Sequence, residues 1–228
     1  MVLALNLRFL SELILHIETA TKTCSVALSE SGVLLDSLDK QAAEYIHGEY
    51  LTIFIDELLQ GCNKSLKDLD AISISIGPGS YTGLRIGLAV AKGLCFGLKI
   101  PLISVETLDS LLSSGKKVHP NENLCAVLDA RRMEVYSKLI SLEGTTLSNT
   151  EATVVDESTF KNHEPFVFFG DGAAKLMEVW SGRDVLINND IKLSATGQLH
   201  ISINKFRSKE FEDLAYSKPM YIKEFKAG

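Results

Sequence analysis

The sequence predicts an α/β protein made of two similar lobes. Short apolar runs of strand length alternate along the chain with longer segments of helical periodicity. Each half opens in the same way: an apolar strand ends in an acid, and a short turn leads into a second strand. Glu18 and Asp129 are these acids, 111 residues apart. Two such lobes that face each other form a cleft between their strand ends, where ligands tend to bind.

The composition is that of a globular protein. Of the 228 residues, 46% are hydrophobic and 23% are charged, and the net charge is −6. Because a protein that grips a phosphate backbone by itself usually carries a basic excess, we expect any RNA contact to need a partner. The apolar N-terminus is interrupted by charges, so we expect no membrane span. The four cysteines, at positions 24, 62, 95 and 125, favour buried free thiols in a reducing cytosol.

The first half reads as five strands and three helices. Strands are expected at 13–17, 24–28, 33–38, 71–76 and 100–105, the first three as a meander, and helices at 42–62, 80–97 and 106–113. The second half predicts strands at 124–128, 134–142 and 167–169, and helices from about 174 to 180 and at 193–204.

The domain division follows from these elements. We assign residues 1–105 to an N-terminal lobe, with 1–12 as a disordered extension, and residues 106–228 to a C-terminal lobe. The polar stretch 116–123 contains Pro120 and is interpreted as the junction. We expect the last segment of the chain to pack back on the first lobe.

A glycine-rich turn carries the most information. Gly77, Pro78, Gly79 and Gly83 fix a tight path between a strand and a helix, where backbone N–H groups can hold an anion. The turn is not a P-loop, because Leu84 stands where a lysine is needed, and its glycine spacing is not that of a dinucleotide fold. Both a ligand loop and a purely structural turn remain open, and the structural turn is favoured.

Two helices carry more apolar surface than one core needs. Glycine and alanine recur every fourth residue in the helix 80–97, and the helix 42–62 shows a second apolar stripe away from its first. A helix wedged inside its own lobe would explain this surplus, and so would a partner. As partner-interface candidates we take Ile46, Tyr50, Ile53, Gly83, Gly87, Val90, Ala91 and Leu94.

The sequence offers no convincing catalytic, cofactor or metal set. His47 has Leu51 one helical turn further on, where a second ligand would be needed, and a surface or interface position is the better interpretation. Glu18 and Asp129 could hold a hydrated magnesium ion in the cleft, or could cap their turns.

Four segments together resemble the TsaB (YeaZ) family. They are residues 14–21 (Ile-Leu-His-Ile-Glu-Thr-Ala-Thr) with 24–28, residues 77–89 (Gly-Pro-Gly-Ser-Tyr-Thr-Gly-Leu-Arg-Ile-Gly-Leu-Ala), residues 129–136 (Asp-Ala-Arg-Arg-Met-Glu-Val-Tyr), and the closing Pro-Met-Tyr at 219–221. The resemblance extends from Leu13 to Phe225.

The resemblance implies an ASKHA fold (actin, sugar kinase and Hsp70 type), with two RNase H-like lobes of mixed sheets and flanking helices. It implies a cytoplasmic, non-catalytic subunit that scaffolds and activates the paralogous enzyme TsaD, beside the ATPase TsaE. The complex forms threonylcarbamoyladenosine beside the anticodon of tRNAs that read codons starting with A. The implied partners are TsaD in a heterodimer, TsaE, tRNA through the complex only, and a second copy when the chain is alone.

The chain departs from active ASKHA relatives in ways that favour the inert subunit. The glycines that usually follow the acid of each first turn are absent, and Arg131, Arg132 and Met133 occupy the second turn. We therefore expect no cofactor in the isolated chain, with a nucleotide only at a shared interface of the complex. The alternatives are a free-standing ATPase or small-molecule kinase and, less favoured, the glycoprotease of older descriptions.

Overall fold

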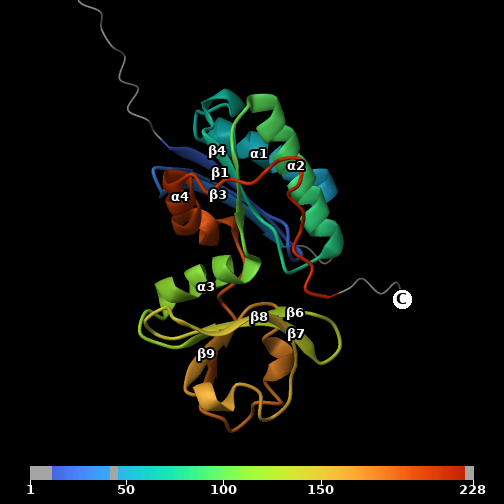
Figure 1. Cartoon of the computed structure of the whole chain (residues 1–228), viewed down its shortest axis with the longest axis vertical. Coiled ribbons are helices and arrows are strands. Elements are labelled where there is room, and N and C mark those ends of the chain that lie inside the picture. Colours follow the sequence, from blue (N-terminus) through green and yellow to red (C-terminus); the bar gives the residue numbers. More distant parts are fainter. Residues whose placement is uncertain (1–11, 42–45, 224–228) are drawn as a thin grey trace, which may run out of the picture.

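The computed structural model describes residues 12–41 and 46–223, which form two lobes stacked along the long axis of the molecule (Figure 1). The predicted extension at 1–12 lies outside these residues, except for Glu12, whose carboxylate accepts hydrogen bonds from Arg207. Residues 42–45 of the predicted helix 42–62 also lie outside them. No helix within the described ranges is long and apolar enough to cross a bilayer.

The first lobe is built on a mixed sheet with the strand order β3-β2-β1-β4-β5. Antiparallel pairing joins β1, β2 and β3, as the predicted meander requires, and parallel pairing adds β4 and β5. The strands are β1 (Leu13–Glu18), β2 (Thr23–Glu30), β3 (Val33–Gln41), β4 (Ala71–Ser75) and β5 (Leu102–Val105).

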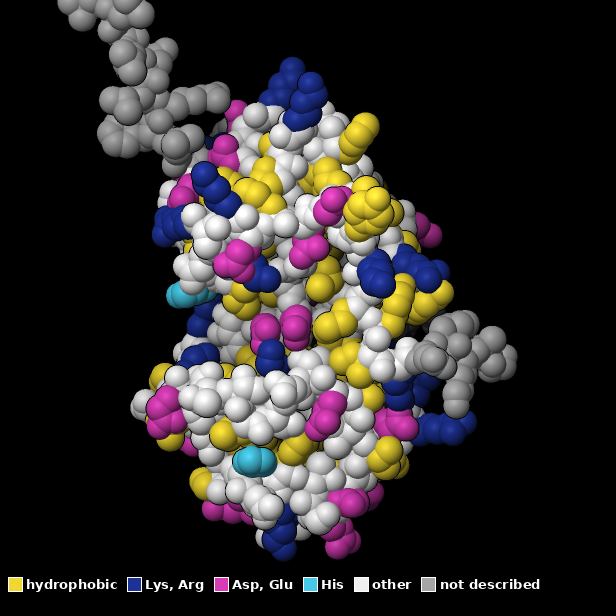
Figure 2. Space-filling view, in the orientation of Figure 1, with side chains coloured by type: hydrophobic (Ala, Val, Ile, Leu, Met, Phe, Trp, Pro, Cys, Tyr) yellow, Lys and Arg dark blue, Asp and Glu magenta, His cyan; other side chains and the backbone are white. Residues whose placement is uncertain are grey.

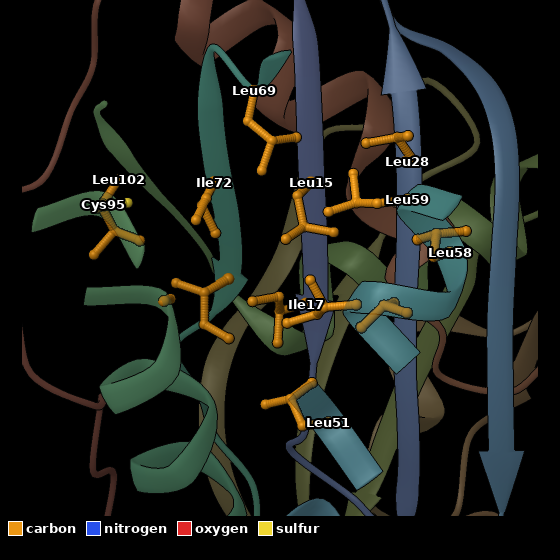
Figure 3. Packing of buried hydrophobic residues seen from close by; sticks show 14 of the residues in the cluster. Leu15, Ile17, Leu28, Leu51, Leu58, Leu59, Leu69, Ile72, Cys95 and Leu102 are labelled. Atoms are coloured by element: carbon orange, nitrogen blue, oxygen red, sulfur yellow. The ribbon is translucent and has the colours of Figure 1, made fainter. Parts of the chain in front are cut away.

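Helices cover both faces of this sheet. α1 (His47–Gly61) and α2 (Tyr81–Leu98) lie side by side on one face, and α4 (Leu199–Ser208) covers the other (Figure 1). The apolar side chains between the sheet and the two helices include Leu15, Ile17 and Leu51 (Figure 3). Every residue of β1 and β4 is buried, because each strand has a helical layer on both sides.

The second lobe repeats the topology of the first. Its sheet has the order β10-β9-β6-β7-β8, in which β6 to β10 take the places of β1 to β5. The strands are β6 (Leu124–Asp129), β7 (Glu134–Ile140), β8 (Thr146–Val154), β9 (Phe166–Phe169) and β10 (Val185–Ile187). Helix α3 (Thr107–Val118) packs on one face of this sheet. The internal repeat that the two acids predicted is therefore present in the fold.

Three elements differ from the sequence-based expectation. β8 and β10 were not predicted, since β8 is largely polar and exposed and β10 has only three residues. The helix expected up to Trp180 is only a short 3-10 turn, Ala174–Leu176, because its apolar residues pack around the buried Trp180 from irregular backbone. Further on, the 3-10 turn η4 (Ala195–Gln198) precedes α4.

The lobes meet through apolar contact. Ala20 of the first turn and Leu84 of α2 belong to the same buried cluster as Leu111 of α3 and Leu128 of β6. After α4 the chain runs back along the first lobe, where the Met220 N–H donates to the carbonyl oxygen of Ile76 at 2.7 Å.

Candidate functional site

The acid at the end of β1 points into the first lobe. The Glu18 side chain is fully buried; its Oε1 accepts the N–H of Ala20 at 2.8 Å, and its Oε2 accepts the hydroxyl of Ser75. Burial raises the pKa of Glu18 to about 7, although these hydrogen bonds oppose the rise. The Glu18 carboxyl therefore caps its turn and is shielded from the space between the lobes.

A buried polar network lies behind Glu18, between the sheet and α4. Gln198 donates to the carbonyl oxygen of Ile17 at 2.7 Å and to Ser75 Oγ at 3.1 Å. The His16 ring lies 2.7 Å from Ser29 Oγ and 3.1 Å from Ser202 Oγ, and burial lowers the pKa of this histidine to about 3. A neutral His16 thus joins strand and helix by hydrogen bonds.

The glycines after β4 serve packing. A Cβ atom on Gly79 would lie 2.5 Å from the carbonyl oxygen of Ala20, and one on Gly83 would lie 2.1 Å from that of Thr19. The turn between β1 and β2 therefore rests directly on the start of α2. This contact gives Gly79 and Gly83 a structural role, and a Cβ atom on Gly77 would lie 2.6 Å from the carbonyl oxygen of Met220.

The second lobe presents the same arrangement in a more open form. Asp129 Oδ1 accepts the N–H of Arg131 at 2.9 Å, two residues on, as Glu18 does with Ala20. Lys175 pairs with the same oxygen at 2.5 Å, so the carboxylate of Asp129 is held at the surface. Arg131 and Arg132 both have positive φ, of 67° and 49°, a conformation that costs a non-glycine residue about 1 kcal/mol.

His47 and the cysteines are packing residues. His47 is buried, and its Nε2 lies 2.8 Å from the carbonyl oxygen of Thr21, so the prediction of a surface or interface histidine is wrong. The reason is the close approach of the β1–β2 turn to α1. All four cysteines are free; Cys62 is half-buried and the other three are buried, and burial raises the pKa of all four thiols. Within residues 12–41 and 46–223, no three His, Cys, Asp or Glu side chains are grouped as metal ligands.

The predicted interface residues fall into two groups. Ile53 is 47% exposed on α1, while Ile46, Tyr50, Val90 and Leu94 are half-buried, and Lys40 of β3 lies over the Tyr50 ring at 4.0 Å. Next to them the outer face of α2 exposes Ala89, Gly93 and Phe96, the last at 80%. We call these residues on the two neighbouring helices the helix face. Apolar side chains along α2 are visible on the right of Figure 2.

The other group must be corrected. Gly83, Gly87 and Ala91 are buried on the inner face of α2, so the prediction that they meet a partner is wrong. A Cβ atom on Gly87 would lie 2.2 Å from Thr19 Oγ1 and 3.1 Å from Ile74 Cδ1. The small residues let α2 approach its own sheet. At Gly93 a Cβ atom would meet nothing within 4 Å.

A feature missed by the sequence analysis is the use of the two charges on α2. Arg85 donates from Nε to the Tyr221 hydroxyl at 2.8 Å, and Lys92 donates to the carbonyl oxygen of Ser217 at 3.0 Å. Both side chains hold the C-terminal segment that returns along the first lobe. The sequence signal for this role was that Arg85 and Lys92 are isolated charges in an otherwise apolar helix.

The two equivalent lobes, each with a capped acid at the end of its first strand, define an ASKHA-type α/β protein, in which the turn after the first strand of the first lobe is closed by packing. A family model described as "TsaD: tRNA N6-adenosine threonylcarbamoyltransferase" matches residues 40–222. The chain belongs to this family, within its TsaB (YeaZ) branch.

Known relatives and solved structures agree with this assignment. The TsaB protein of Haemophilus influenzae, a "tRNA threonylcarbamoyladenosine biosynthesis protein", is 36% identical over 123 residues, which cover 54% of this chain and 51% of the relative. The TsaB of Bacillus subtilis is 35% identical over 55% of this chain and 54% of its own length. The chain thus spans about half the length of these relatives.

Two structures from Pseudomonas aeruginosa extend the similarity over nearly the whole chain. YeaZ superposes with a TM-score of 0.77 at 25% identity, covering 92% of this chain and 99% of that one. A protein described as similar to "peptidase YEAZ" gives 0.79 at 25% identity, covering 93% and 100%.

Proposed function

We propose that this protein is a non-catalytic subunit of the complex that forms threonylcarbamoyladenosine in tRNA, and that it scaffolds and activates TsaD, beside TsaE. Family membership supports the pathway. The observation that carries the non-catalytic role is the buried Glu18: in the lobe that contains the family's glycine turn, the strand-end acid is sealed inside and its turn rests on α2.

The same geometry supports the absence of a cofactor in the isolated chain. A phosphate needs bare backbone N–H groups at a strand-end turn, and here Ala20 and Leu84 pack into the other lobe. In the second turn the N–H of Arg131 is already donated to Asp129 Oδ1. A nucleotide would then bind only where a partner completes the site. This favours the inert subunit over a free-standing ATPase or kinase. We also propose that the protein is cytoplasmic, where the tRNA substrate of the complex is found.

The helix face is the proposed contact with TsaD. It combines exposed apolar side chains on α1 and α2 with small residues that let another helix approach. Because TsaD is a paralogue, the same surface is suited to pair with a second copy of this chain. We therefore propose a homodimer when the chain is alone and a heterodimer, through the same face, when TsaD is present.

Ile53→Asp is expected to weaken both assemblies at least about 100-fold, because it places a charge in the centre of an apolar contact, where such changes cost about 3 kcal/mol or more. Sedimentation velocity of the chain alone, and titration with TsaD, measure the effect. The matched control is Thr52→Asp, which puts the same residue on the exposed polar side of α1. A monomeric wild type at high concentration, together with unchanged TsaD affinity in Ile53→Asp, would place the interface elsewhere.

A further inference from the structure

The last described residues join the first lobe to the turn between β6 and β7. Tyr221 accepts the hydrogen bond from Arg85, and its ring centroid lies 5.4 Å from that of Tyr81. Two residues further on, Lys223 forms an ion pair with Glu134, which ends that turn. Two extended residues span at most about 7 Å. The C-terminal segment therefore links Arg85 of α2 to the β6–β7 turn, at the level where this segment leaves α2 in Figure 1.

Two consecutive arginines, Arg131 and Arg132, stand at the tip of this turn. The side chains of Arg131 and Arg132 are exposed. The neighbouring acids, Asp129 and Glu134, each pair with a lysine instead. Across the part of the chain that the structure describes, no carboxylate forms an ion pair with either arginine. Figure 2 shows basic side chains gathered at the upper right edge of the second lobe.

The backbone makes arginine an unfavourable choice at both positions. Arg131 and Arg132 have φ values of 67° and 49°, in the left-handed region that glycine adopts without steric cost and asparagine adopts more easily than other residues. A turn selected for stability alone would carry those residues. Strained backbone concentrates at functional sites, and here the strained turn carries two consecutive exposed arginines.

We propose that Arg131 and Arg132, together with Arg85 and Tyr221, form a surface that binds the phosphate backbone of RNA. The proposal rests on the proposed function, in which the substrate of the complex is a tRNA. Guanidinium groups bind phosphate oxygens through paired, charge-assisted hydrogen bonds. Tyr221 is 44% exposed and offers a ring on which an unpaired base can stack. We name these four residues the arginine surface.

The chemistry of the arginine surface fits RNA better than a protein partner. The centre of a protein interface is depleted of charge, and the apolar surface suited to such a contact lies on the helix face. The chain as a whole carries a net charge of −6, so it repels RNA except where basic groups gather. The arginine surface therefore orients tRNA on the complex and adds no base specificity, as phosphate contacts generally do.

The test measures tRNA affinity with the chain assembled on TsaD of the same organism. The probe is a fluorescently labelled, unmodified transcript of a tRNA that reads codons starting with A, titrated by anisotropy from 50 to 200 mM salt. Arg131→Gly/Arg132→Gly keeps the turn and relieves its strain, so its melting temperature should not fall. Its affinity at 50 mM salt should fall about tenfold, and the slope of log K against log salt should drop by about two.

Two further variants make the result specific. Lys67→Gln/Lys161→Gln removes the same net charge from exposed sites elsewhere on the chain and should keep wild-type affinity and slope. Arg131→Asn/Arg132→Asn also tolerates the backbone and should match the glycine pair. Wild-type affinity and slope in both arginine variants overturn the proposal. The proposal is also overturned if the arginine variants assemble less with TsaD while the complex that still forms keeps wild-type tRNA affinity. That result would assign the arginines to a protein contact.

Failure of this proposal is distinguishable from failure of the proposed function. Restoration of threonylcarbamoyladenosine in cells by the wild-type chain tests the function without reference to the arginine surface. If the arginine variants keep wild-type tRNA affinity and restore the modification as well as the wild type does, the proposed function is supported and only the role of the arginine surface is contradicted.

Discussion

Gly83→Ala is expected to destabilise the protein by about 3 kcal/mol, because one added methyl group would lie 2.1 Å from the carbonyl oxygen of Thr19. That atom is backbone and cannot rotate away, and the ring of His47 closes the other side at 3.2 Å. Relief requires α2 to move off the β1–β2 turn. For a protein of this size the melting temperature should fall by roughly 6–12 °C.

Gly93→Ala, on the same helix, is the matched control. A Cβ atom there meets nothing within 4 Å, so alanine should stabilise the helix by about 0.5–1 kcal/mol through its higher propensity. If Gly83 and Gly87 lie on the inner face of α2, thermal melts should show a lower melting temperature for Gly83→Ala and a higher one for Gly93→Ala. Equal, small effects at Gly83 and Gly93 would contradict the packing described for α2.

Glu18→Gln is expected to stabilise the protein strongly at high pH and little at low pH. The pKa of Glu18 is raised from 4.5 to about 7 in the folded state, so folding favours the protonated form. The stability that this group contributes is complete below pH 4.5 and is lost as the pH rises to about 7. Above pH 7 the wild type holds a buried carboxylate, at a cost of about 3 kcal/mol. Glutamine imitates the protonated acid and avoids that cost.

The measurement is the difference in unfolding free energy between variant and wild type, from urea melts at pH 5 and pH 8. The advantage of Glu18→Gln should grow by about 2–3 kcal/mol over this interval. His16 has a lowered pKa and destabilises the fold toward acid, but it is common to both proteins and cancels in the difference. Asp129→Asn, at the exposed equivalent position, should gain no stability at pH 8. A pH-independent difference would mean that Glu18 is not buried as described.

The lobe architecture could be predicted from the sequence because its signals are local. Fully apolar strands such as β1 and β4 are buried on both faces, and their pattern needs no tertiary information. β8 could not be found this way. Its residues are mostly polar, and it is a strand only because β7 offers it a hydrogen-bonding edge.

The candidate site was harder to predict for a related reason. The small residues on α2 show that something approaches the helix closely, but periodicity cannot tell a partner helix from the chain's own sheet. Gly87 faces Thr19, 68 positions earlier in the chain, and this contact exists only after folding. In contrast, Ile53 could be placed on the surface from its position away from the main apolar stripe. Arg85 looked anomalous in sequence, and its role depends on Tyr221, 136 residues away.

The central claim, a non-catalytic subunit of the threonylcarbamoyladenosine complex, is tested most directly by the threonylcarbamoyladenosine content of total tRNA. The measurement uses mass spectrometry on cells depleted of their own TsaB and supplied with this chain or its variants. We expect the wild type and Asp129→Asn to restore the modification equally and Ile53→Asp to fail to restore it. The claim would be contradicted if the wild type did not restore the modification. It would also be contradicted if Asp129→Asn failed to restore it and the purified chain showed an ATPase activity that this variant abolishes.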